Sequence, residues 1–377
     1  MIKVKLGEVA DILSGYAFKS TQFNTEKRGL PLIRIRDVER GFSDTYFEGD
    51  FAEEYLVHNG DLLITMDGSF ILKKWAGGEA LLNQRVCKLI IRDNRVEEDY
   101  ISWIVPKYLK EIEDKTPFVT VKHLSVAKIN EISFELPHRS EQLVISNQLN
   151  NIKDIYNLRL QQLSKLSDLV KSRFYEMFGD PILNEKNWKK CHLKDIATEK
   201  LSYGSGASAV EFSGLRYIRI TDIDDNGNLK SDAKSPSSFD EKYLLNDGDI
   251  LFARSGATVG KTFCYSRQKH GRAIYAGYLI RLVPDFKQVN STFVYHFTNT
   301  KYYDDFIFKA QKAVAQPNIN AQQYGELDFI LPPLTLQNQF ADFVAEVDKS
   351  QLAGQMVLKL WRKLLKFSII KLSFYEK

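Results

Sequence analysis

The sequence predicts an α+β protein: two homologous, mixed α/β domains in tandem, separated by two long helices that pack as an antiparallel coiled coil with pseudo-two-fold symmetry. Two observations carry this prediction. Four blocks of sequence occur twice in the same order along the 377 residues, and a long segment with coiled-coil-like apolar spacing follows each set of blocks. The predicted parts are a first domain (1–138), a first spacer helix (139–180), a second domain (181–334) and a second spacer helix (335–377).

The repeated blocks define the elements of each domain. VKLGEVADI returns as CHLKDIATE, LPLIRIRDV as LRYIRITDI, VHNGDLLIT as LNDGDILFA, and VKHLSVAKINEISFELP as QPNINAQQYGELDFILP. The matching blocks are 4–12 and 191–199, 30–38 and 215–223, 57–65 and 245–253, and 121–137 and 316–332. The offset between matching blocks varies along the chain, so the loops between blocks differ in length while the blocks persist.

Each domain is predicted to open with a short helix, at LGEVADIL or LKDIATEK, followed by a turn at Gly15 or Gly204. Strands are predicted where apolar and β-branched residues lie between turn signals. In chain order they are PLIRIRDV, DLLITM and QRVCKLIIR in the first domain, and RYIRITDI, DILFAR and GYLIRLVP in the second. A helix near DYISWIVPKYLKEI has its counterpart at TFVYHFTNTKYYDDFIFKA. Ser125 and Asn320 then occupy matching positions that suit helix N-caps.

Apolar residues recur every three or four positions in both long segments, which favours helices that pair along a seam. These residues are Leu149, Ile152, Tyr156, Leu163, Leu166, Val170 and Met177 in the first segment, and Phe340, Phe343, Val347, Val357, Trp361 and Leu364 in the second. Gly179 and Pro181 are predicted to end the first helix, since a C-cap glycine followed by proline stops helices. If a two-fold axis relates the repeats, the two helices must run antiparallel.

Composition narrows the class of protein. The formal net charge is only +4, and the positive excess lies in residues 139–190 and 335–377, so any basic nucleic-acid footprint must be local. No apolar run is long enough to span a membrane, and the N-terminal sequence does not have the pattern of a signal peptide. A cytoplasmic protein is therefore expected. Cys87, Cys191 and Cys264 are too far apart to predict a zinc site or a disulfide framework.

The stretch Ser255–Thr262, SGATVGKT, differs by one residue from a phosphate-binding loop, which raises an ATP-binding enzyme as one alternative. Such a loop needs a strand before it and a helix after it, whereas Thr262 leads into strand-like and turn-like sequence. The matching stretch of the first domain, LLITMDGSFILKKWAG, has no GK[ST]. A loop that varies on a constant scaffold is typical of recognition. No catalytic or metal-binding residues are assigned, and the chain is expected not to be an enzyme.

The order of these parts resembles the specificity subunit of type I DNA restriction-modification systems. The segments that carry the resemblance are NGDLLIT, DGDILFARSG followed by VGK, QPNINAQQYGELDFILPPLTLQNQF and KSRFYEMFGDPILNEKNW, and it covers essentially the whole chain. The resemblance implies two target recognition domains, each reading one half of a bipartite, asymmetric site on double-stranded DNA in the major groove. It also implies that the long helices set the spacer between the half-sites.

The same resemblance implies a non-catalytic subunit that binds two methyltransferase subunits and two restriction-translocase subunits. S-adenosylmethionine, ATP and Mg would belong to those partners, and this chain would hold no cofactor of its own. The recognition subunit of a type IIB or related methylation-dependent defence system is an alternative with the same layout.

The candidate DNA-contacting residues lie in the loops that differ between the two domains. In the first domain they are Met66, Asp67, Ser69, Lys73, Lys74, Asn83, Gln84, Arg85, Lys122 and His123; in the second they are Arg254, Ser255, Thr258, Lys261, Gln316 and Asn318. Lysine and arginine suit phosphate groups or guanine, and amides suit adenine edges. For the charged residues the alternative is a solvated surface charge, and for the amides it is a hydrogen bond within a turn or helix cap.

Overall fold

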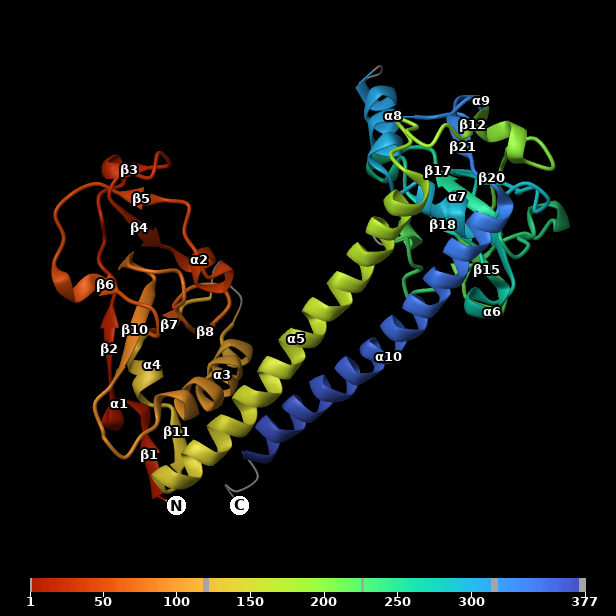
Figure 1. Cartoon of the computed structure of the whole chain (residues 1–377). Helices are drawn as coiled ribbons and strands as arrows, with labels where there is room; N and C mark the ends of the chain where they lie inside the picture. Colours follow the sequence, from red (N-terminus) through yellow and green to blue (C-terminus); the bar gives the residue numbers. More distant parts are fainter. Residues whose placement is uncertain (1, 118–121, 225–226, 313–317, 373–377) are drawn as a thin grey trace. The chain divides into compact units, whose positions relative to one another are not determined.

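The computed structural model describes residues 2–117, 122–224, 227–312 and 318–372, with the backbone alone for residues 364–372. Contacts divide the chain into two compact units: Met1–Arg159 with Val357–Lys377, and Leu160–Met356. Each unit contains one copy of the repeat (Figure 1). We call residues 2–138 the first head and residues 181–333 the second head.

The core of the first head is a four-stranded antiparallel sheet in the order β2–β10–β7–β8. Its strands are β2 (Ala10–Ser14), β7 (Leu62–Thr65), β8 (Leu72–Lys74) and β10 (Val86–Ile91). A second sheet has the order β3–β5–β4–β9–β6, with β3 (Phe23–Asn24), β4 (Leu30–Ile33), β5 (Tyr46–Phe47), β6 (Leu56–Val57) and β9 (Ala80–Leu82). Strands β4 and β9 are parallel. A separate antiparallel pair joins β1 (Ile2–Lys5) to β11 (Ser133–Leu136) near the end of the head.

Helices cover the four-stranded sheet of the first head and complete its core. They are α1 (Leu6–Val9), α2 (Ile35–Arg40), α3 (Glu98–Lys115) and α4 (Val126–Asn130), with 3-10 turns η1 (Ser20–Gln22) and η2 (Glu53–Tyr55). The buried face of α3 places Ile101, Val105 and Leu109 in one cluster with Ile64 and Cys87 of the sheet. Burying several aliphatic side chains of this size supplies the main stabilisation of such a layer.

The second head repeats this arrangement. Its four-stranded sheet has the order β13–β20–β17–β18, from β13 (Ser202–Tyr203), β17 (Ile250–Ala253), β18 (Thr262–Cys264) and β20 (Leu279–Leu282). The other pairs are β12 (Lys189–His192) with β21 (Asp328–Leu331), β14 (Ala209–Glu211) with β16 (Lys234–Pro236), and β15 (Arg216–Ile218) parallel to β19 (Ala273–Tyr275). Its helices are α6 (Arg267–His270), α7 (Ser291–Phe297), α8 (Lys301–Lys312) and α9 (Ala321–Gly325), with turns η3 (Leu193–Ile196), η4 (Ile220–Asp222), η5 (Glu241–Tyr243) and η6 (Gly256–Thr258). The repeat seen in the sequence is thus confirmed as a repeat of the fold.

Two of the predicted strands are extended only in their first half. PLIRIRDV and RYIRITDI leave the extended conformation after Ile33 and Ile218 and turn into α2 and η4. In the first head the Asp37 carboxylate accepts a hydrogen bond from the Arg34 backbone N–H at 3.0 Å. Asp222 does the same for the second head. An acidic residue that closes back on the residue before a helix starts that helix, so the prediction of strand up to Val38 and Ile223 was wrong.

The first predicted helix, LGEVADIL, is also shorter than predicted. Only Leu6–Val9 is helical, and Ala10–Ser14 forms β2, the edge strand that pairs with β10. In the second head η3 replaces the helix and ends at Ile196. Pairing with a neighbouring strand outweighs local helix propensity here, as tertiary context commonly does.

The helix predicted over TFVYHFTNTKYYDDFIFKA is two helices, α7 and α8. The buried side chains of Thr298 and Thr300 lie at the break. Their hydroxyls donate to the Tyr295 and Phe297 carbonyls at 2.6 and 2.7 Å. Such local side-chain bonds compete with the helical pattern. The predicted N-caps are confirmed: the Ser125 side chain accepts from the Lys128 N–H, and Asn320 from Gln323.

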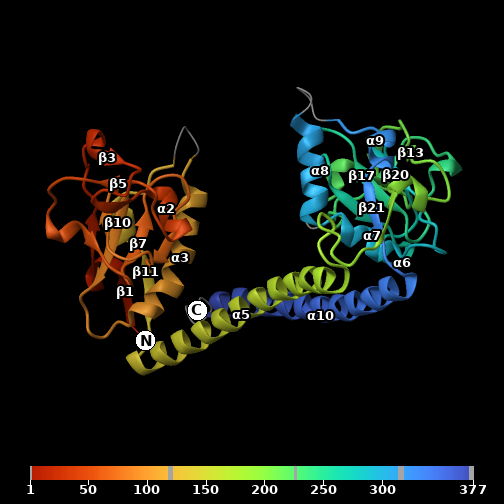
Figure 2. The ribbon, with the colours of Figure 1, turned by 45° about the horizontal axis from the view of Figure 1, so that its top comes forward.

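The two long helices are α5 (Arg139–Phe178) and α10 (Leu334–Leu372). Within the second unit, residues 160–178 and 334–356 of these helices pack on each other (Figures 1 and 2). The Gln351 amide donates to the Ser167 hydroxyl at 3.1 Å, and the rings of Phe174 and Phe340 meet at 5.6 Å. Residue numbers rise along one helix and fall along the other, so the predicted antiparallel pairing is confirmed in this unit.

The predicted seam is apolar and covered. Each seam residue whose side chain the structure describes is buried or half-buried. Leu364 lies among the residues described by backbone alone. The predicted stop is confirmed as well: α5 ends at Phe178, and Gly179, with φ +75°, donates its N–H to the Tyr175 carbonyl. Among the described residues, no helix is both long and apolar enough to cross a membrane.

A fully buried glutamine joins the first head to α5. The Gln142 side-chain oxygen accepts from the Glu97 N–H at 2.9 Å, just ahead of α3. Its amide nitrogen donates to the carbonyls of Arg95 and Pro137, at 2.9 and 2.8 Å. All three partners are backbone atoms of the head.

Gln337 makes the same joint between the second head and α10. Its oxygen accepts from the Asn290 N–H at 2.9 Å, ahead of α7. Its nitrogen donates to the carbonyls of Gln288 and Pro332, at 3.2 and 2.8 Å. The two heads are therefore attached to their helices in the same way.

Candidate nucleic-acid interface

Backbone hydrogen bonds tie three loops of the first head together where β7 ends. The Met66 N–H donates to the Arg85 carbonyl at 2.9 Å, and the Leu124 N–H donates to the Met66 carbonyl at 2.7 Å. Asp67 and His123 then form an isolated antiparallel bridge. These bonds bring together residues that are far apart in the sequence.

The same bonds occur in the second head where β17 ends. The Arg254 N–H donates to the Tyr278 carbonyl at 3.1 Å, and the Ile319 N–H donates to the Arg254 carbonyl at 2.8 Å. Ser255 and Asn318 form the matching isolated bridge. The pattern identifies equivalent positions without reference to side chains: Met66 and Arg254, Asp67 and Ser255, Arg85 and Tyr278, His123 and Asn318.

Three of the predicted residues of the first head form one polar cluster. Asp67 Oδ1 lies 2.6 Å from His123 Nδ1, and Asp67 Oδ2 lies 3.3 Å from Arg85 Nη1. The carboxylate is mostly covered, at 17% exposed, whereas the imidazole and guanidinium are 52% and 55% exposed. Because an ionised carboxylate only accepts hydrogen bonds, Nδ1 of His123 carries the proton in this contact. Two nitrogen-rich side chains are thus held at the surface by one recessed acid.

The predicted lysines of the first head all contact the protein. Lys73 donates its ammonium to the Glu39 carbonyl at the end of α2. Lys122 donates to the Glu113 carbonyl at 2.6 Å. Lys74 pairs with carboxylates of α3, including Asp99 at 2.9 Å, and this hydrogen bond lowers the pKa of Asp99. Lys74 is therefore partly neutralised by its acidic neighbours.

The remaining predicted residues of this head divide into two kinds. The side chains of Met66 and Asn83 are buried, so they support the loops from inside. Ser69 and Gln84 are exposed on the two turns that flank the cluster.

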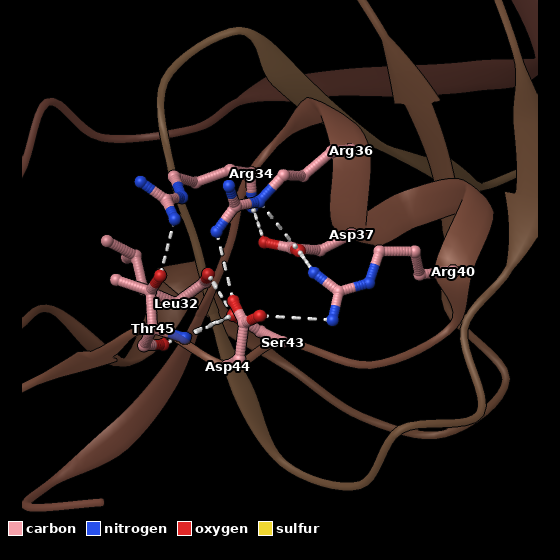
Figure 3. A network of polar contacts seen from close by, with 8 residues as sticks. All are labelled: Leu32, Arg34, Arg36, Asp37, Arg40, Ser43, Asp44 and Thr45. Atoms are coloured by element: carbon pink, nitrogen blue, oxygen red, sulfur yellow. Dashed lines mark hydrogen bonds and ion pairs between the residues drawn. The ribbon is translucent and has the colours of Figure 1, made fainter. Parts of the chain in front are cut away.

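Sequence reasoning missed an arginine-rich cluster on α2, which Figure 3 shows. The Glu39 carbonyl that accepts from Lys73 belongs to the same helix. Arg36 and Arg40 are one helical turn apart and both pair with Asp44, at 3.0 and 3.1 Å. Both also approach the buried carboxylate of Asp37. The guanidinium of Arg40 lies 4.1 Å above the exposed ring of Phe42. The signal in the sequence was the i, i+4 spacing of two arginines on one helix face.

The Ser255–Thr262 stretch of the second head is a β-hairpin connection. It joins β17 to β18, which pair antiparallel, and its only helical part is the single 3-10 turn η6. The buried Thr262 hydroxyl shares a hydrogen bond with Thr298 at 2.7 Å. A phosphate-binding loop leads into a long helix and keeps this hydroxyl for a metal ion. The geometry therefore contradicts the ATP-binding alternative and leaves the loop at the surface of the head.

Arg254 organises the surface of the second head. Its guanidinium lies 4.6 Å above the ring of Tyr203, and its Nε donates to Asn318 Oδ1 at 3.2 Å. The Tyr203 hydroxyl in turn accepts from the Ala321 N–H at 3.0 Å. Tyr278 is 63% exposed beside this group. Sequence reasoning missed both tyrosines. Tyr278 follows Gly277 and directly precedes β20, as Arg85 directly precedes β10.

The other predicted residues of the second head lie around the hairpin. The Thr258 hydroxyl donates to the Ser255 carbonyl at 3.2 Å, and Lys261 is half-buried at the edge of a pocket lined also by Asp304 and Asp305. Gln316 lies outside the described residues. In the part of the chain that the structure describes, no three His, Cys, Asp or Glu side chains are grouped so as to hold a metal ion.

The chain thus carries the same loop-bearing head twice, with different side chains at the equivalent loop positions. The chain belongs to the Type I restriction modification DNA specificity domain family, which it matches over residues 1–167 and 185–355. It is thus of the specificity-subunit type, a family that is itself non-catalytic.

Relatives of established name support this assignment. The chain is 27% identical to the type I restriction enzyme EcoBI specificity subunit of Escherichia coli, over 92% of this chain and 79% of the relative. It is 20% identical to the MjaVIII specificity subunit of Methanocaldococcus jannaschii, over 78% and 74%. The fold is similar to that of the type I restriction-modification S subunit from M. genitalium, with a TM-score of 0.60 and 14% identity, covering 98% and 95% of the two chains.

Proposed function

We propose that this chain directs a type I restriction-modification complex to a bipartite, asymmetric DNA site, and that each head reads one half-site in the major groove. The observation that carries the proposal is the set of equivalent loop positions. The backbone contacts there are the same, while the side chains are Asp67, Arg85 and His123 in one head and Ser255, Tyr278 and Asn318 in the other. Different donor and acceptor patterns on one scaffold read different base edges.

The proposed DNA-contacting surface consists of the predicted residues whose side chains reach the surface, together with those that the structure adds. These are Asp67, Ser69, Lys73, Lys74, Gln84, Arg85, Lys122 and His123 with Arg36 and Arg40 in the first head, and Arg254, Ser255, Thr258, Lys261 and Asn318 with Tyr278 in the second. The lysines and the α2 arginines suit phosphate groups, which position the protein without reading sequence.

The long helices are proposed to set the distance between half-sites and to bind two methyltransferase subunits, with two restriction-translocase subunits completing the complex. Exposed apolar side chains along both helices support a docking role, since such residues mark protein contacts. They are Leu143, Val144, Ile155, Leu158, Leu160 and Leu169 on α5, and Leu352, Met356 and Leu360 on α10. S-adenosylmethionine, ATP and Mg²⁺ are proposed to act in those partners.

Exchange of one head tests the proposal. Residues 191–334 would be replaced by the matching segment of a relative, and the adenine-methylation motif of cells carrying the variant with its methyltransferase partner would be sequenced. We expect one half-site to change and the other to stay the same. Replacement of residues 1–138 is the reciprocal control and should change the other half-site. A variant whose two half-sites both change would show that the heads are not independent readers.

A further inference from the structure

We infer that Arg85 reads a guanine in the half-site of the first head, and that Asp67 is the positioning residue that aims its guanidinium. The inference rests on the proposed function, because it presupposes that the first head meets a base-pair edge. Three observations carry it: the backbone conformation of Arg85, the carboxylate behind its side chain, and the loss of both features in the second head.

Arg85 has a backbone conformation that arginine rarely adopts. It is the third residue of a tight turn in which the Val86 N–H donates to the Asn83 carbonyl at 3.2 Å, and its φ is +74°. Glycine or asparagine adopts this region with less strain. Two further backbone hydrogen bonds hold the turn. The Met66 N–H donates to the Arg85 carbonyl, and the Gln84 N–H donates to the Tyr16 carbonyl. Strain of this kind at an exposed side chain points to a function outside the fold.

The side chain of Arg85 is aimed by a recessed acid. Asp67 holds Arg85 Nη1 through one oxygen and His123 Nδ1 through the other, at 3.3 and 2.6 Å. The contact between Arg85 and Asp67 is an ion pair, and no guanidinium N–H of Arg85 donates a hydrogen bond to any residue in the described ranges. The ion pair therefore biases the orientation of a rigid, planar fork, and its N–H donors are left for a ligand. The O6 and N7 acceptors of guanine match such an edge as a bidentate pair.

The same carboxylate makes a phosphate the poorer ligand. A phosphate also accepts two hydrogen bonds from arginine, but it would bring a second negative charge close to Asp67. Guanine presents neutral acceptors to the major groove, and they do not meet this repulsion. An exposed arginine paired with an aspartate in this way therefore favours a base edge over the DNA backbone.

The second head has neither the left-handed backbone nor the carboxylate. Tyr278 stands where Arg85 does, and its φ is not in the left-handed region. Ser255 replaces Asp67, so the equivalent position has no charge to aim a guanidinium. The guanine contact is therefore a property of the first head and should affect one half-site only.

Selection from randomised duplexes tests the inference, with the full-length chain bound to its methyltransferase partner. The variant is Arg85→Asn, and the control is Lys27→Asn, because Lys27 is also an exposed cation of the first head with a left-handed backbone, at φ +62°. The wild type and the control should select the same bipartite motif. Arg85→Asn should lose roughly ten- to a hundredfold of the preference for guanine at one position, with the other positions kept.

Two further variants separate reading from charge. Arg85→Lys keeps the charge and loses the fork, so it should also lose the guanine preference; if it selects the wild-type motif, Arg85 is a phosphate contact and the inference is wrong. Asp67→Asn should weaken preference at the same base pair as Arg85→Asn, and the double variant should lose no more than the single arginine variant. Loss at a different position, or a fully additive loss, would overturn the positioning role.

The outcomes distinguish the inference from the function on which it rests. If the wild type selects a bipartite motif and folded Arg85→Asn selects it unchanged, the inference fails and the proposed function stands. If the wild type selects no bipartite motif, the proposed function itself fails. Thermal unfolding shows whether each variant is folded, and Arg85→Asn should not lower the midpoint, since asparagine tolerates this backbone.

Discussion

Where β7 ends in the first head, a carboxylate, a guanidinium and an imidazole meet; where β17 ends in the second head, the same backbone positions carry a hydroxyl, a phenol and an amide. The backbone hydrogen bonds that create these positions differ by only a few tenths of an ångström between the heads. The two heads thus share these main-chain contacts although their side chains differ. Recognition chemistry can change at such sites while the fold is kept.

One acid–base ion pair is instead kept in both heads. Asp61 pairs with Lys88 at 3.2 Å in the first head, and Asp249 pairs with Arg281 at 2.7 Å at the matching place in the second. Both acids also accept a hydrogen bond from a backbone N–H three residues earlier. The pair is partly exposed in the first head and buried in the second, where an unpaired charge would be strongly destabilising.

The buried glutamines give the largest expected effect. Gln142→Ala leaves three backbone groups of the first head without partners, and Gln337→Ala does so in the second. Each change should lower the free energy of unfolding of its own head by roughly 3 kcal/mol. Pulse proteolysis with mass spectrometry of the fragments resolves the two heads. The control is Gln148→Ala, an exposed glutamine on α5; equal loss in both heads from one variant would mean that the joints are not independent.

Acidification should lower the stability of the second head more than that of the first, by less than the glutamine substitutions do. Burial lowers the pKa of His296 in α7 to about 4, against about 6.5 in an unfolded chain. As the pH falls, His296 is therefore protonated in the unfolded chain before it is protonated in the folded chain. The stability of the folded head is unaffected by this residue above pH 6.5 and falls as the pH drops from about 6.5 to 4. At pH 5 the second head should lose roughly 1–2 kcal/mol from this residue.

A non-titrating variant isolates that contribution. His296→Gln should reduce the difference in stability of the second head between pH 7 and pH 5, measured by urea-dependent pulse proteolysis. At the matching place the first head has Trp103, whose Nε1 donates to Asn150 at 2.9 Å and does not titrate in this range. An unchanged pH dependence in the variant would assign the loss to other groups, such as His270, whose pKa burial also lowers to about 4.

The turns before β10 and β20 give the smallest effect, and its sign should differ between the heads. Arg85→Gly relieves a left-handed backbone, while the lost exposed ion pair with Asp67 is worth little, so stability should rise by about 0.5 kcal/mol. Tyr278→Gly relieves no backbone strain and increases the conformational entropy of the unfolded chain. The free energy of unfolding should therefore fall by about 0.5–1 kcal/mol. Thermal unfolding measures both, and a fall for Arg85→Gly would mean that the turn is not strained.

Much of this architecture was predictable because it depends on periodic or repeated sequence. The seams of the long helices follow a spacing that is visible residue by residue, and the caps at Ser125 and Asn320 depend on neighbours three positions away. The tandem heads were predictable because four blocks recur in order. Of the candidate site, Asp67, Arg85 and His123 were named from residue type and loop position alone, and the structure brings them together.

What the sequence did not reveal depends on contacts between distant segments. The strand that ends at Ile33 ends there because Asp37 closes back on Arg34, a choice that tertiary packing stabilises. Ala10–Ser14 forms a strand only because β10 lies beside it. The aromatic support of Arg254 by Tyr203 joins residues about fifty positions apart, and no local pattern indicates it.

The buried glutamine joints have a consequence for how such chains evolve. Gln142 and Gln337 belong to the long helices, yet every atom that they bind in a head is a main-chain N–H or C=O. Main-chain atoms are the same whatever the residue, so a head acquired by recombination already carries the groups that the glutamine needs. New pairings of heads can thus arise by crossover near Pro137 or Pro332 without compensating substitutions in the helix.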